Sequence, residues 1–269
     1  MVPARFEPGL RELAPLAERF ADAGHRLYLV GGSVRDLLVD DGRTDFDLDL
    51  TTDARPERIK SLVSGWAEAV WTQGEKFGTI GAQRTHPDTG EVRPYEITTF
   101  RAEAYTDDSR KPVVEFADDI EADLARRDFT VNAMALEVTG LSAGDASVAD
   151  PAGSPVLVDP FDGAVDLLQK RLRTPMGPDV SFSDDPLRML RAARFIARYQ
   201  LEPTDELRTA VVAMADRLEI VSAERIRDEL DKLITVDHPA AGLWFLVDTG
   251  LAEQFLPELP NMRLENDPI

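Results

Sequence analysis

The sequence contains no cysteine and only three histidines, and these two scarcities exclude several kinds of site. Without thiols, the protein can form neither disulfides nor a thiolate metal centre. His25, His86 and His238 are too scattered to resemble a zinc motif. No apolar run approaches the ~18 residues that suggest a membrane span, and the N-terminal residues lack the apolar core of a secretory signal. We therefore expect a cytoplasmic protein.

Basic residues are also scarce relative to acidic ones. The chain has 30 Lys and Arg against 50 Asp and Glu, a net charge of −20. A nucleic-acid-binding surface is usually basic, because neutralising phosphates releases counterions. The composition therefore excludes a broad surface of this kind, and any phosphate site must be a local arginine cluster. The acidity otherwise serves solubility.

The hydrophobic pattern predicts two domains within the 269 residues. Up to about residue 160, helical and strand patterns alternate without the regular repeat of a doubly wound fold. Beyond it, helical periodicity dominates and strand signals nearly vanish. We expect an α/β head over residues 1–160 and an all-helical region over 161–269. Two stretches predict irregular structure: residues 101–117 are polar and indicate a mobile loop, and residues 139–155 indicate a flexible linker or a long hairpin loop.

Three aspartates alternate with apolar residues in the stretch TDFDLDLTT, residues 44–52. On a strand, residues two apart point the same way, so Asp45 and Asp47 would share one face. Magnesium prefers oxygen ligands and often bridges carboxylates to substrate phosphates. Asp49 extends that face but is not assigned to the metal. Glu96 could be a third acidic ligand if its strand lies beside the aspartate strand. The alternative is a solvated strand face, which an isolated pair of this kind usually is.

A glycine turn precedes these aspartates in the string GGSVRD, residues 31–36. Backbone N–H groups in such a turn at a helix start can bind anionic oxygens, because small residues let phosphate approach. Gly31, Gly32 and Ser33 form this candidate site, and Arg35 adds a bidentate donor. A dinucleotide-binding loop would need glycines at further positions that this string does not fill.

One Asp and three Arg recur every three residues within FSDDPLRMLRAARF, residues 182–195: Asp185, Arg188, Arg191 and Arg194. Each side chain lags its predecessor by ~60° around a helix, so the row winds as a ridge. A carboxylate only accepts hydrogen bonds and a guanidinium only donates them. An Asp–Arg pair can therefore accept cytosine or adenine, and reject guanine or uracil, without a template. The alternative is a solvated helix with an Asp cap and ion pairs.

These motifs together resemble the class II CCA-adding enzymes and bacterial poly(A) polymerases of the nucleotidyltransferase superfamily. GGSVRDLLVDDGRTDFD matches the family's first motif, and RRDFTVNAMAL a second. EITTFR with YTDDSRKP resembles the family's third acidic strand and mobile loop. DDPLRMLRAARF matches the base-recognition helix, and ERIRDEL a later helical motif. The resemblance runs from about residue 27 to 234, in family order.

The resemblance implies an α+β fold: a head with a mixed, largely antiparallel sheet, followed by an all-helical neck. It implies Mg²⁺-dependent addition of C and A from CTP and ATP to the 3′ end of tRNA, with release of pyrophosphate. Poly(A) tailing, or a partial CC- or A-adding activity, fits the same motifs. A nucleotide-binding or regulatory module without transferase activity is the alternative from another class.

Residue by residue, the resemblance assigns the metal to Asp45 and Asp47, with support for Glu96. It gives nucleotide contacts to Gly32, Arg35 and Arg127. The same match makes Asp185 and Arg188 base readers and gives phosphate or ribose contacts to Arg191 and Arg194. It also implies that Asp128 and Asn132 shape the pocket or contact the sugar, and that Arg225 and Glu229 are structural.

Family members usually continue past the neck into helical regions that grip tRNA, and some carry a phosphohydrolase domain with His-Asp pairs. This sequence stops at NMRLENDPI, shortly after the neck motif, and has no His-Asp pair. We therefore expect nucleotide chemistry to be retained and tRNA binding to be weaker than in longer relatives.

Overall fold

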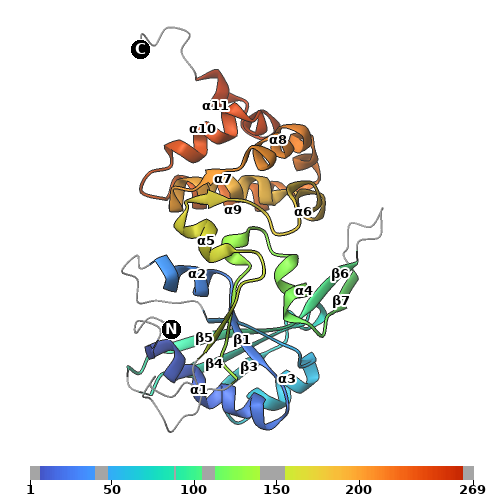
Figure 1. The fold of residues 1–269 in the computed structure, drawn as a ribbon, viewed down its shortest axis with the longest axis vertical. Helices are drawn as coiled ribbons and strands as arrows, with labels where there is room; N and C mark the ends of the chain where they lie inside the picture. The colour runs from blue at the N-terminus through green and yellow to red at the C-terminus, as the bar shows by residue number, and fades with distance from the viewer. Residues whose placement is uncertain (1–6, 40–47, 88, 105–112, 140–154, 263–269) are drawn as a thin grey trace. The chain divides into compact units, whose positions relative to one another are not determined.

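The computed structural model describes residues 7–39, 48–87, 89–104, 113–139 and 155–262 (Figure 1). These residues form two compact units. Unit 1 comprises Met1–Arg126 and Val131–Ala164, and unit 2 comprises Arg127–Thr130 and Val165–Ile269. The short segment 127–130 therefore belongs to the second unit although it lies within the first unit's stretch of sequence. The sequence pattern did not predict that these four residues would pack with the second unit.

Unit 1 is built on a seven-stranded sheet in the order β3-β4-β5-β2-β1-β8-β9. The strands are β1 (Leu27–Val30), β2 (Leu48–Thr52), β3 (Ala69–Trp71), β4 (Thr79–Thr85), β5 (Val92–Thr99), β8 (Ala135–Glu137) and β9 (Val156–Val158). Neighbouring strands pair antiparallel except β2 and β5, which run parallel. The sheet is thus mixed and largely antiparallel, as the resemblance implied.

Alternation along the strands gives the sheet two different faces. Leu27 and Leu29 of β1 enter the larger core, which α1 (Glu7–Asp22) and α3 (Pro56–Val63) cover. Tyr28 and Val30 point to the opposite face and pack with α4 (Ile120–Ala125). This second core reaches β8 and β9 but includes no residue of β2, β4 or β5. α2 (Gly32–Val39) follows β1 and buries Val34 and Leu37 in the larger core.

Unit 2 is almost entirely helical, as expected. Its described helices are α6 (Pro178–Asp184), α7 (Leu187–Tyr199), α8 (Asp205–Met214), α9 (Ala223–Ile234), α10 (Ala240–Asp248) and α11 (Glu258–Asn261), with η4 (Ala215–Ile220) and η5 (Leu251–Gln254) between them. α5 (Gly163–Leu168) bridges the division of the chain. One parallel pair of two-residue strands, β10 (Arg171–Leu172) and β11 (Glu202–Pro203), is the exception to helical structure that the sequence did not predict.

α7 is the central helix of unit 2, and most of its apolar residues are buried. Gly242 of α10 lets that helix approach closely: a Cβ there would lie 2.4 Å from the Ala193 carbonyl oxygen and 2.7 Å from the Leu233 side chain. Because a real Cβ never sits so close, only glycine fits this contact between α10, α7 and α9. The arginines of α7 are therefore carried by a helix that its neighbours hold tightly.

The stretch 101–117 was predicted to be a loop, and that prediction is wrong at both ends. Arg101–Ala104 form β6 and Val113–Phe116 form β7, paired antiparallel with Arg101 opposite Phe116. The polar middle of the stretch obscured the β-branched and aromatic residues of β7, which favour a strand. Residues 105–112, and most of the predicted linker 139–155, lie outside the described residues.

Candidate active site

The first group of candidate residues belongs to unit 1, and its described strand members lie on the face of β2 and β5 opposite the larger core. Asp49 and Glu96 face each other in the parallel register of these strands, and both are exposed. The strand of Glu96 thus lies beside the aspartate strand, which was the condition for its candidacy. Asp45 and Asp47 lie outside the described residues. They directly precede β2 in the sequence.

Trp71 lies close to the Asp49 and Glu96 strands, and sequence reasoning did not identify it as part of this region. Gly81 of β4 is opposite Glu96 on one side and Trp71 on the other. A Cβ at Gly81 would lie 1.9 Å from the Trp71 ring, so the indole lies over the glycine backbone. The glycine was visible in the strand pattern, and a glycine inside a strand often marks such a close approach.

The glycine turn adopts the conformation that its sequence requires. Gly31 has φ 69°, a left-handed value that favours glycine. The turn leads directly into α2, where the Arg35 amide donates to the Gly31 carbonyl at 3.1 Å. Ser33 and Arg35 are both buried in this first turn.

Arg35 is held by two neighbours in unit 1. Its Nε and Nη2 donate to Asp36 Oδ1 at 2.8 and 2.7 Å, and its Nη1 donates to the Asn132 side-chain oxygen. Asn132 ends a short 3-10 turn more than ninety residues along the chain, so its partner could not be deduced locally. Arg35 is 6% exposed, and its guanidinium has a fixed orientation beside the glycine turn.

The second group belongs to unit 2 and starts where α6 ends and α7 begins. The Asp185 side chain accepts the Leu187 amide at 3.2 Å, and its backbone carbonyl accepts the Arg188 amide at 3.0 Å. Arg188 Nη1 donates back to the Ser181 hydroxyl at 3.0 Å. Asp185 and Arg188 are therefore joined through the backbone, while their side chains, both partly exposed, contact other residues.

Arg191 and Arg194 turn away from that pair toward carboxylates of unit 2. Arg191 Nε and Nη2 donate to Asp128 Oδ2 at 2.9 and 2.5 Å, and the Asp128 charge is the main reason that the pKa of Arg191 is raised. Arg194 Nε donates to Glu229, a buried residue of α9. Arg188, Arg191 and Arg194 lie on α7, whereas Asp185 precedes the helix in extended backbone. Arg127, the remaining arginine, is half-buried beside Asp128.

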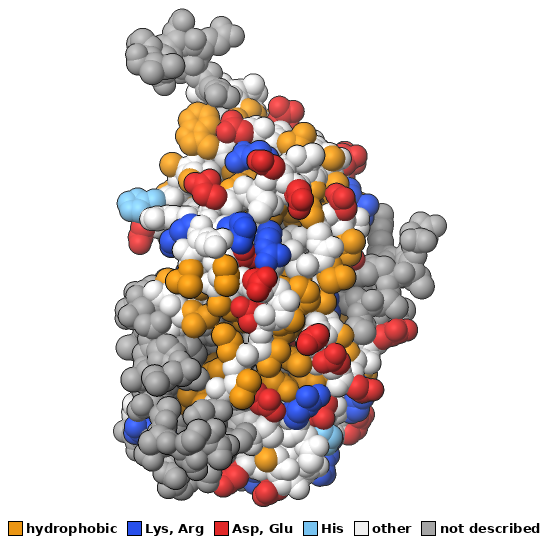
Figure 2. Space-filling model, viewed as in Figure 1, with side chains coloured by type: hydrophobic (Ala, Val, Ile, Leu, Met, Phe, Trp, Pro, Cys, Tyr) orange, Lys and Arg blue, Asp and Glu red, His pale blue; other side chains and the backbone are white. Residues whose placement is uncertain are grey.

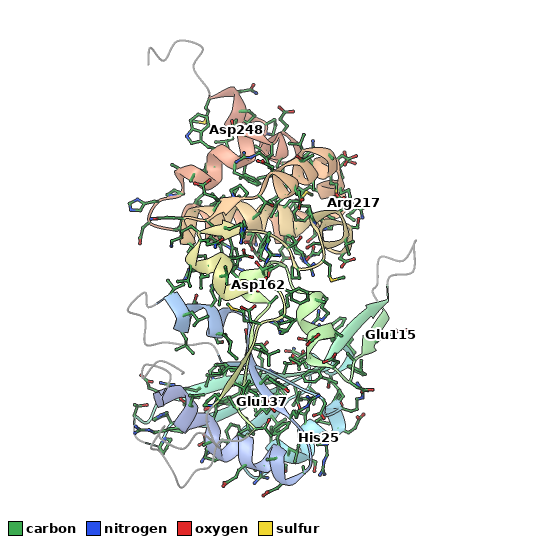
Figure 3. All side chains as sticks on the ribbon, in the orientation of Figure 1. His25, Glu115, Glu137, Asp162, Arg217 and Asp248 are labelled. Carbon is green, nitrogen blue, oxygen red and sulfur yellow. The ribbon has the colours of Figure 1, made fainter. Side chains whose placement is uncertain are left out.

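Sequence reasoning placed no functional role on Arg225, yet it contacts the candidate base reader. Its Nη2 lies 2.8 Å from Asp185 Oδ2. The two residues are 40 positions apart, so only the packing of α9 beside the start of α7 brings them together. Arg217, labelled in Figure 3, donates to the Ser183 carbonyl at 3.1 Å and joins η4 to α6 just before Asp185.

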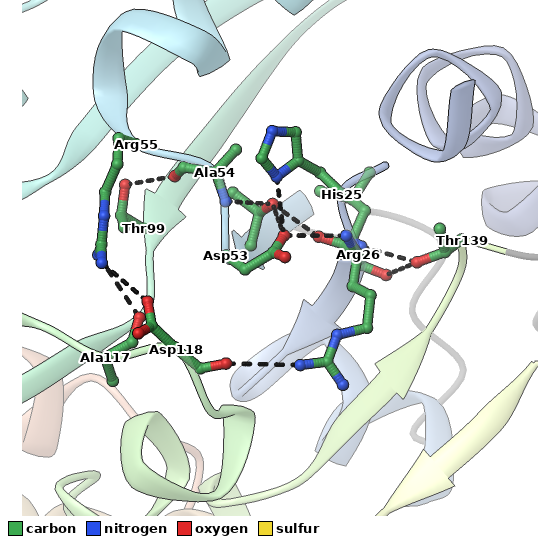
Figure 4. Close-up of polar contacts among 11 residues, drawn as sticks. His25, Arg26, Asp53, Ala54, Arg55, Thr99, Ala117, Asp118 and Thr139 are labelled. Carbon is green, nitrogen blue, oxygen red and sulfur yellow. Dashed lines mark hydrogen bonds and ion pairs between the residues drawn. The ribbon is translucent and has the colours of Figure 1, made fainter. Parts of the chain in front are cut away.

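A different charged cluster lies at the far end of β2 and is structural (Figure 4). Asp53 accepts the Arg26 amide at 2.9 Å and faces the His25 ring at 3.3 Å. Arg55 Nη2 donates to Asp118 at 2.8 Å and its guanidinium lies over the Phe116 ring. These contacts tie the strand ends to the base of β7.

The distribution of basic side chains on the drawn face shows no broad basic surface. On the face drawn in Figure 2, basic side chains form small groups among acidic and apolar ones. Among the described residues, no three His, Cys, Asp or Glu side chains gather as a metal site would require. In the same part of the chain, no helix is long and apolar enough to cross a membrane.

The fold and the two residue groups define a class: a mixed-sheet head with a glycine turn and acidic strands, joined in sequence to a helical unit that carries an Asp–Arg ridge. A family model described as "Poly A polymerase head domain" matches residues 27–173. A second, described as "Probable RNA and SrmB- binding site of polymerase A", matches residues 200–262. The chain belongs to the poly A polymerase head domain family, and the resemblance drawn from its motifs is confirmed.

Relatives and solved structures agree with this family. The chain is 36% identical to a CCA-adding enzyme from Lactococcus lactis over 252 residues, 93% of this chain and 57% of the relative. It resembles the crystal structure of the Bacillus stearothermophilus CCA-adding enzyme in complex with CTP, with a TM-score of 0.74, 30% identity, and coverage of 97% of this chain and 57% of that one. A Thermotoga maritima CCA-adding enzyme complexed with tRNA is similar at TM-score 0.70 and 25% identity, over 96% and 54% of the two chains. The chain thus spans little more than half the length of these proteins.

Proposed function

We propose that this chain carries the nucleotide-transferring part of a CCA-adding enzyme. In this proposal, it adds C and A from CTP and ATP to the 3′ end of tRNA and releases pyrophosphate. The observation that carries the proposal is the placement of Asp185 and Arg188 at the junction of α6 and α7, in a chain that is 36% identical to a CCA-adding enzyme over 93% of its length.

The triphosphate would bind at the glycine turn. Gly31, Gly32 and Ser33 lead into the N-terminus of α2, where anions are favoured, while the Gly31 N–H itself donates to the Met134 carbonyl at 3.3 Å. Arg35 stands over this turn with its guanidinium fixed by Asp36 and Asn132. Because a fixed guanidinium loses little conformational freedom on binding, it is suited to hold phosphate oxygens. Arg127 is proposed as a further nucleotide contact, on the resemblance of its motif.

The choice among nucleotides would depend on the hydrogen-bonding groups that each base presents on its pairing edge. Cytosine and adenine each present an amino donor next to a ring-nitrogen acceptor, which complements a carboxylate beside a guanidinium. Guanine and uracil present the reverse and would leave polar groups unpaired, at a cost of about 1–3 kcal/mol each. Asp185 and Arg188 therefore supply the selection, while Arg191 and Arg194 are proposed for the phosphate or ribose.

Asp45 and Asp47, with Glu96, are proposed to hold Mg²⁺. The described part of this site fits an oxygen-preferring cation, because the exposed carboxylates of Glu96 and Asp49 lie beside each other on paired strands. When bound, the ion would supply positive charge to the reacting oxygens. In the reaction, the terminal 3′-oxygen of the RNA bonds to the α-phosphorus, the bond to pyrophosphate breaks, and the hydroxyl proton is released.

The test is a transfer assay with tRNA that lacks its 3′ end, Mg²⁺, and each nucleoside triphosphate alone and in mixture. Addition of C, C and A, in that order, is expected. A long A tail would instead identify a poly(A) polymerase, and addition that stops early a partial enzyme. Nucleotide binding without transfer to any RNA, even at high protein concentration, would favour a regulatory module and refute the proposal.

A further inference from the structure

The carboxylate of Asp185 is held from two directions within unit 2. The Leu187 amide donates to Oδ1 at 3.2 Å, and Arg225 Nη2 donates to Oδ2 at 2.8 Å. Two donors on opposite oxygens fix both the position and the plane of a carboxylate. We propose that Arg225 is a positioning residue for base selection, which sets the Asp185 carboxylate in the orientation that discriminates cytosine and adenine from uracil and guanine. This inference rests on the proposed function, in which Asp185 reads the base.

Arg225 leaves room for the base. An ionised carboxylate offers about four lone-pair positions on its two oxygens. Residues of the described chain occupy two of them, one on each oxygen. An amino group of a nucleobase can therefore be accepted without displacing Arg225. The ion pair is consequently compatible with the reading state and is not a competitor of the nucleotide.

The helix that carries Arg225 is itself fixed against α7. Ser222 caps α9 by accepting the Arg225 amide, so Arg225 lies in the first turn. One turn later, Glu229 is 4% exposed and accepts from Arg194, further along α7. A residue on a rigid, doubly attached helix can hold a partner within the small tolerance that recognition requires.

The ion pair contributes little to folding, because its side chains are 53% and 30% exposed and water screens their attraction. An exposed pair of this kind can therefore be broken without unfolding the unit. Because the pair holds the one carboxylate that is proposed to read the base, its loss is expected to change nucleotide selectivity rather than folding. Loss of Arg225 would free the Asp185 side chain to rotate, and the match to the cytosine edge would weaken.

The test compares the affinities for CTP and UTP, measured calorimetrically with Mg²⁺ and without RNA. Arg225→Ala is expected to lower the CTP-over-UTP preference about threefold to tenfold, the effect of losing orientation at one charged hydrogen bond. Arg225→Lys should restore part of the preference. Arg227→Ala is the matched control, because Arg227 lies on the same helix, is 66% exposed and pairs only locally with Asp228. It should leave the preference unchanged.

A double substitution separates positioning from general damage. In an Asp185→Asn background, Arg225→Ala should change the preference no further, since Arg225 acts through Asp185. The inference is overturned if Arg225→Ala preserves the preference, weakens CTP and UTP equally, or has the same effect with Asn at position 185. Equal binding of CTP and UTP by the unaltered chain would refute the proposed base reading itself, and this inference with it.

Discussion

Arg191 places two donors on one oxygen of Asp128, with Nε and Nη2 at 2.9 and 2.5 Å from Oδ2. Asp128 also accepts the Phe129 amide at 2.8 Å through its other oxygen. The carboxylate is nearly buried, while the guanidinium keeps part of its surface in water. This pair therefore attaches the segment 127–130 to α7 and neutralises a charge that unit 2 would otherwise have to bury.

Replacing Asp128 is expected to destabilise unit 2. Asp128→Asn removes the negative charge and leaves Arg191 without its ion-pair partner, at a cost of about 1–3 kcal/mol. The measurement is the urea midpoint of unfolding at unchanged slope. Asp228→Asn is the control, since Asp228 is 54% exposed in its pair with Arg227 and should cost less than about 1 kcal/mol. Equal midpoints for the two variants would contradict the prediction.

Asp47→Asn is expected to leave the fold intact and lower turnover at least ~100-fold, comparable to losing one preorganised electrostatic group. Asp49→Asn serves as the comparison, because Asp49 is exposed on the same strand pattern but was assigned no metal. It should change turnover by only about twofold, as ordinary surface substitutions do. Circular dichroism verifies folding of both. Near-normal turnover of Asp47→Asn would refute the metal assignment.

Arg35 should affect every nucleotide alike, because it is proposed to contact the triphosphate rather than the base. Asn132→Ala removes one of the groups that orient the Arg35 guanidinium. We expect about a tenfold loss of affinity for both CTP and ATP, with the ratio between them unchanged. Equilibrium binding of all four triphosphates checks this. A loss confined to one base would show that Arg35 belongs to base selection instead.

Gly242→Ala should loosen the packing of α10 on α7 and α9. The added methyl would meet the Ala193 carbonyl at 2.4 Å, and overpacking of this kind costs about 1–3 kcal/mol. The thermal midpoint of unfolding is the readout. Gly9→Ala provides a control in α1, since a Cβ there meets nothing within 4 Å and alanine favours a helix. A Gly242→Ala protein as stable as the unaltered chain would refute the close contact.

Patterns that depend on near neighbours were predictable from the sequence. Helical periodicity placed α7 and α9, and alternation in residues 44–52 placed the strand that includes β2. The glycine turn before a helix start was predicted from GGSVRD, and it is observed between β1 and α2. The resemblance to the family predicted a mixed, largely antiparallel sheet. Local patterns alone could not predict this, because the order and direction of strands depend on pairing between distant segments.

Pairings between distant residues were not predictable. Arg225 and Asp185 are 40 residues apart, and Arg35 and Asn132 are 97 apart. Any of the chain's many carboxylates could have been the partner of Arg225 on composition alone. The β6–β7 pair was missed for a related reason: its strands are four residues each, too short for their pattern to stand out within a polar stretch.

The membership of residues 127–130 in unit 2 limits how the protein can be divided. A fragment that starts at residue 165 would lack Asp128 for Arg191 and also Thr130, whose hydroxyl donates to the buried Asp166 at 2.6 Å. A fragment that ends at residue 164 would carry the same four residues without their partners. The two units are therefore interleaved along the chain. Neither can be excised by a single cut without removing part of the other's interior.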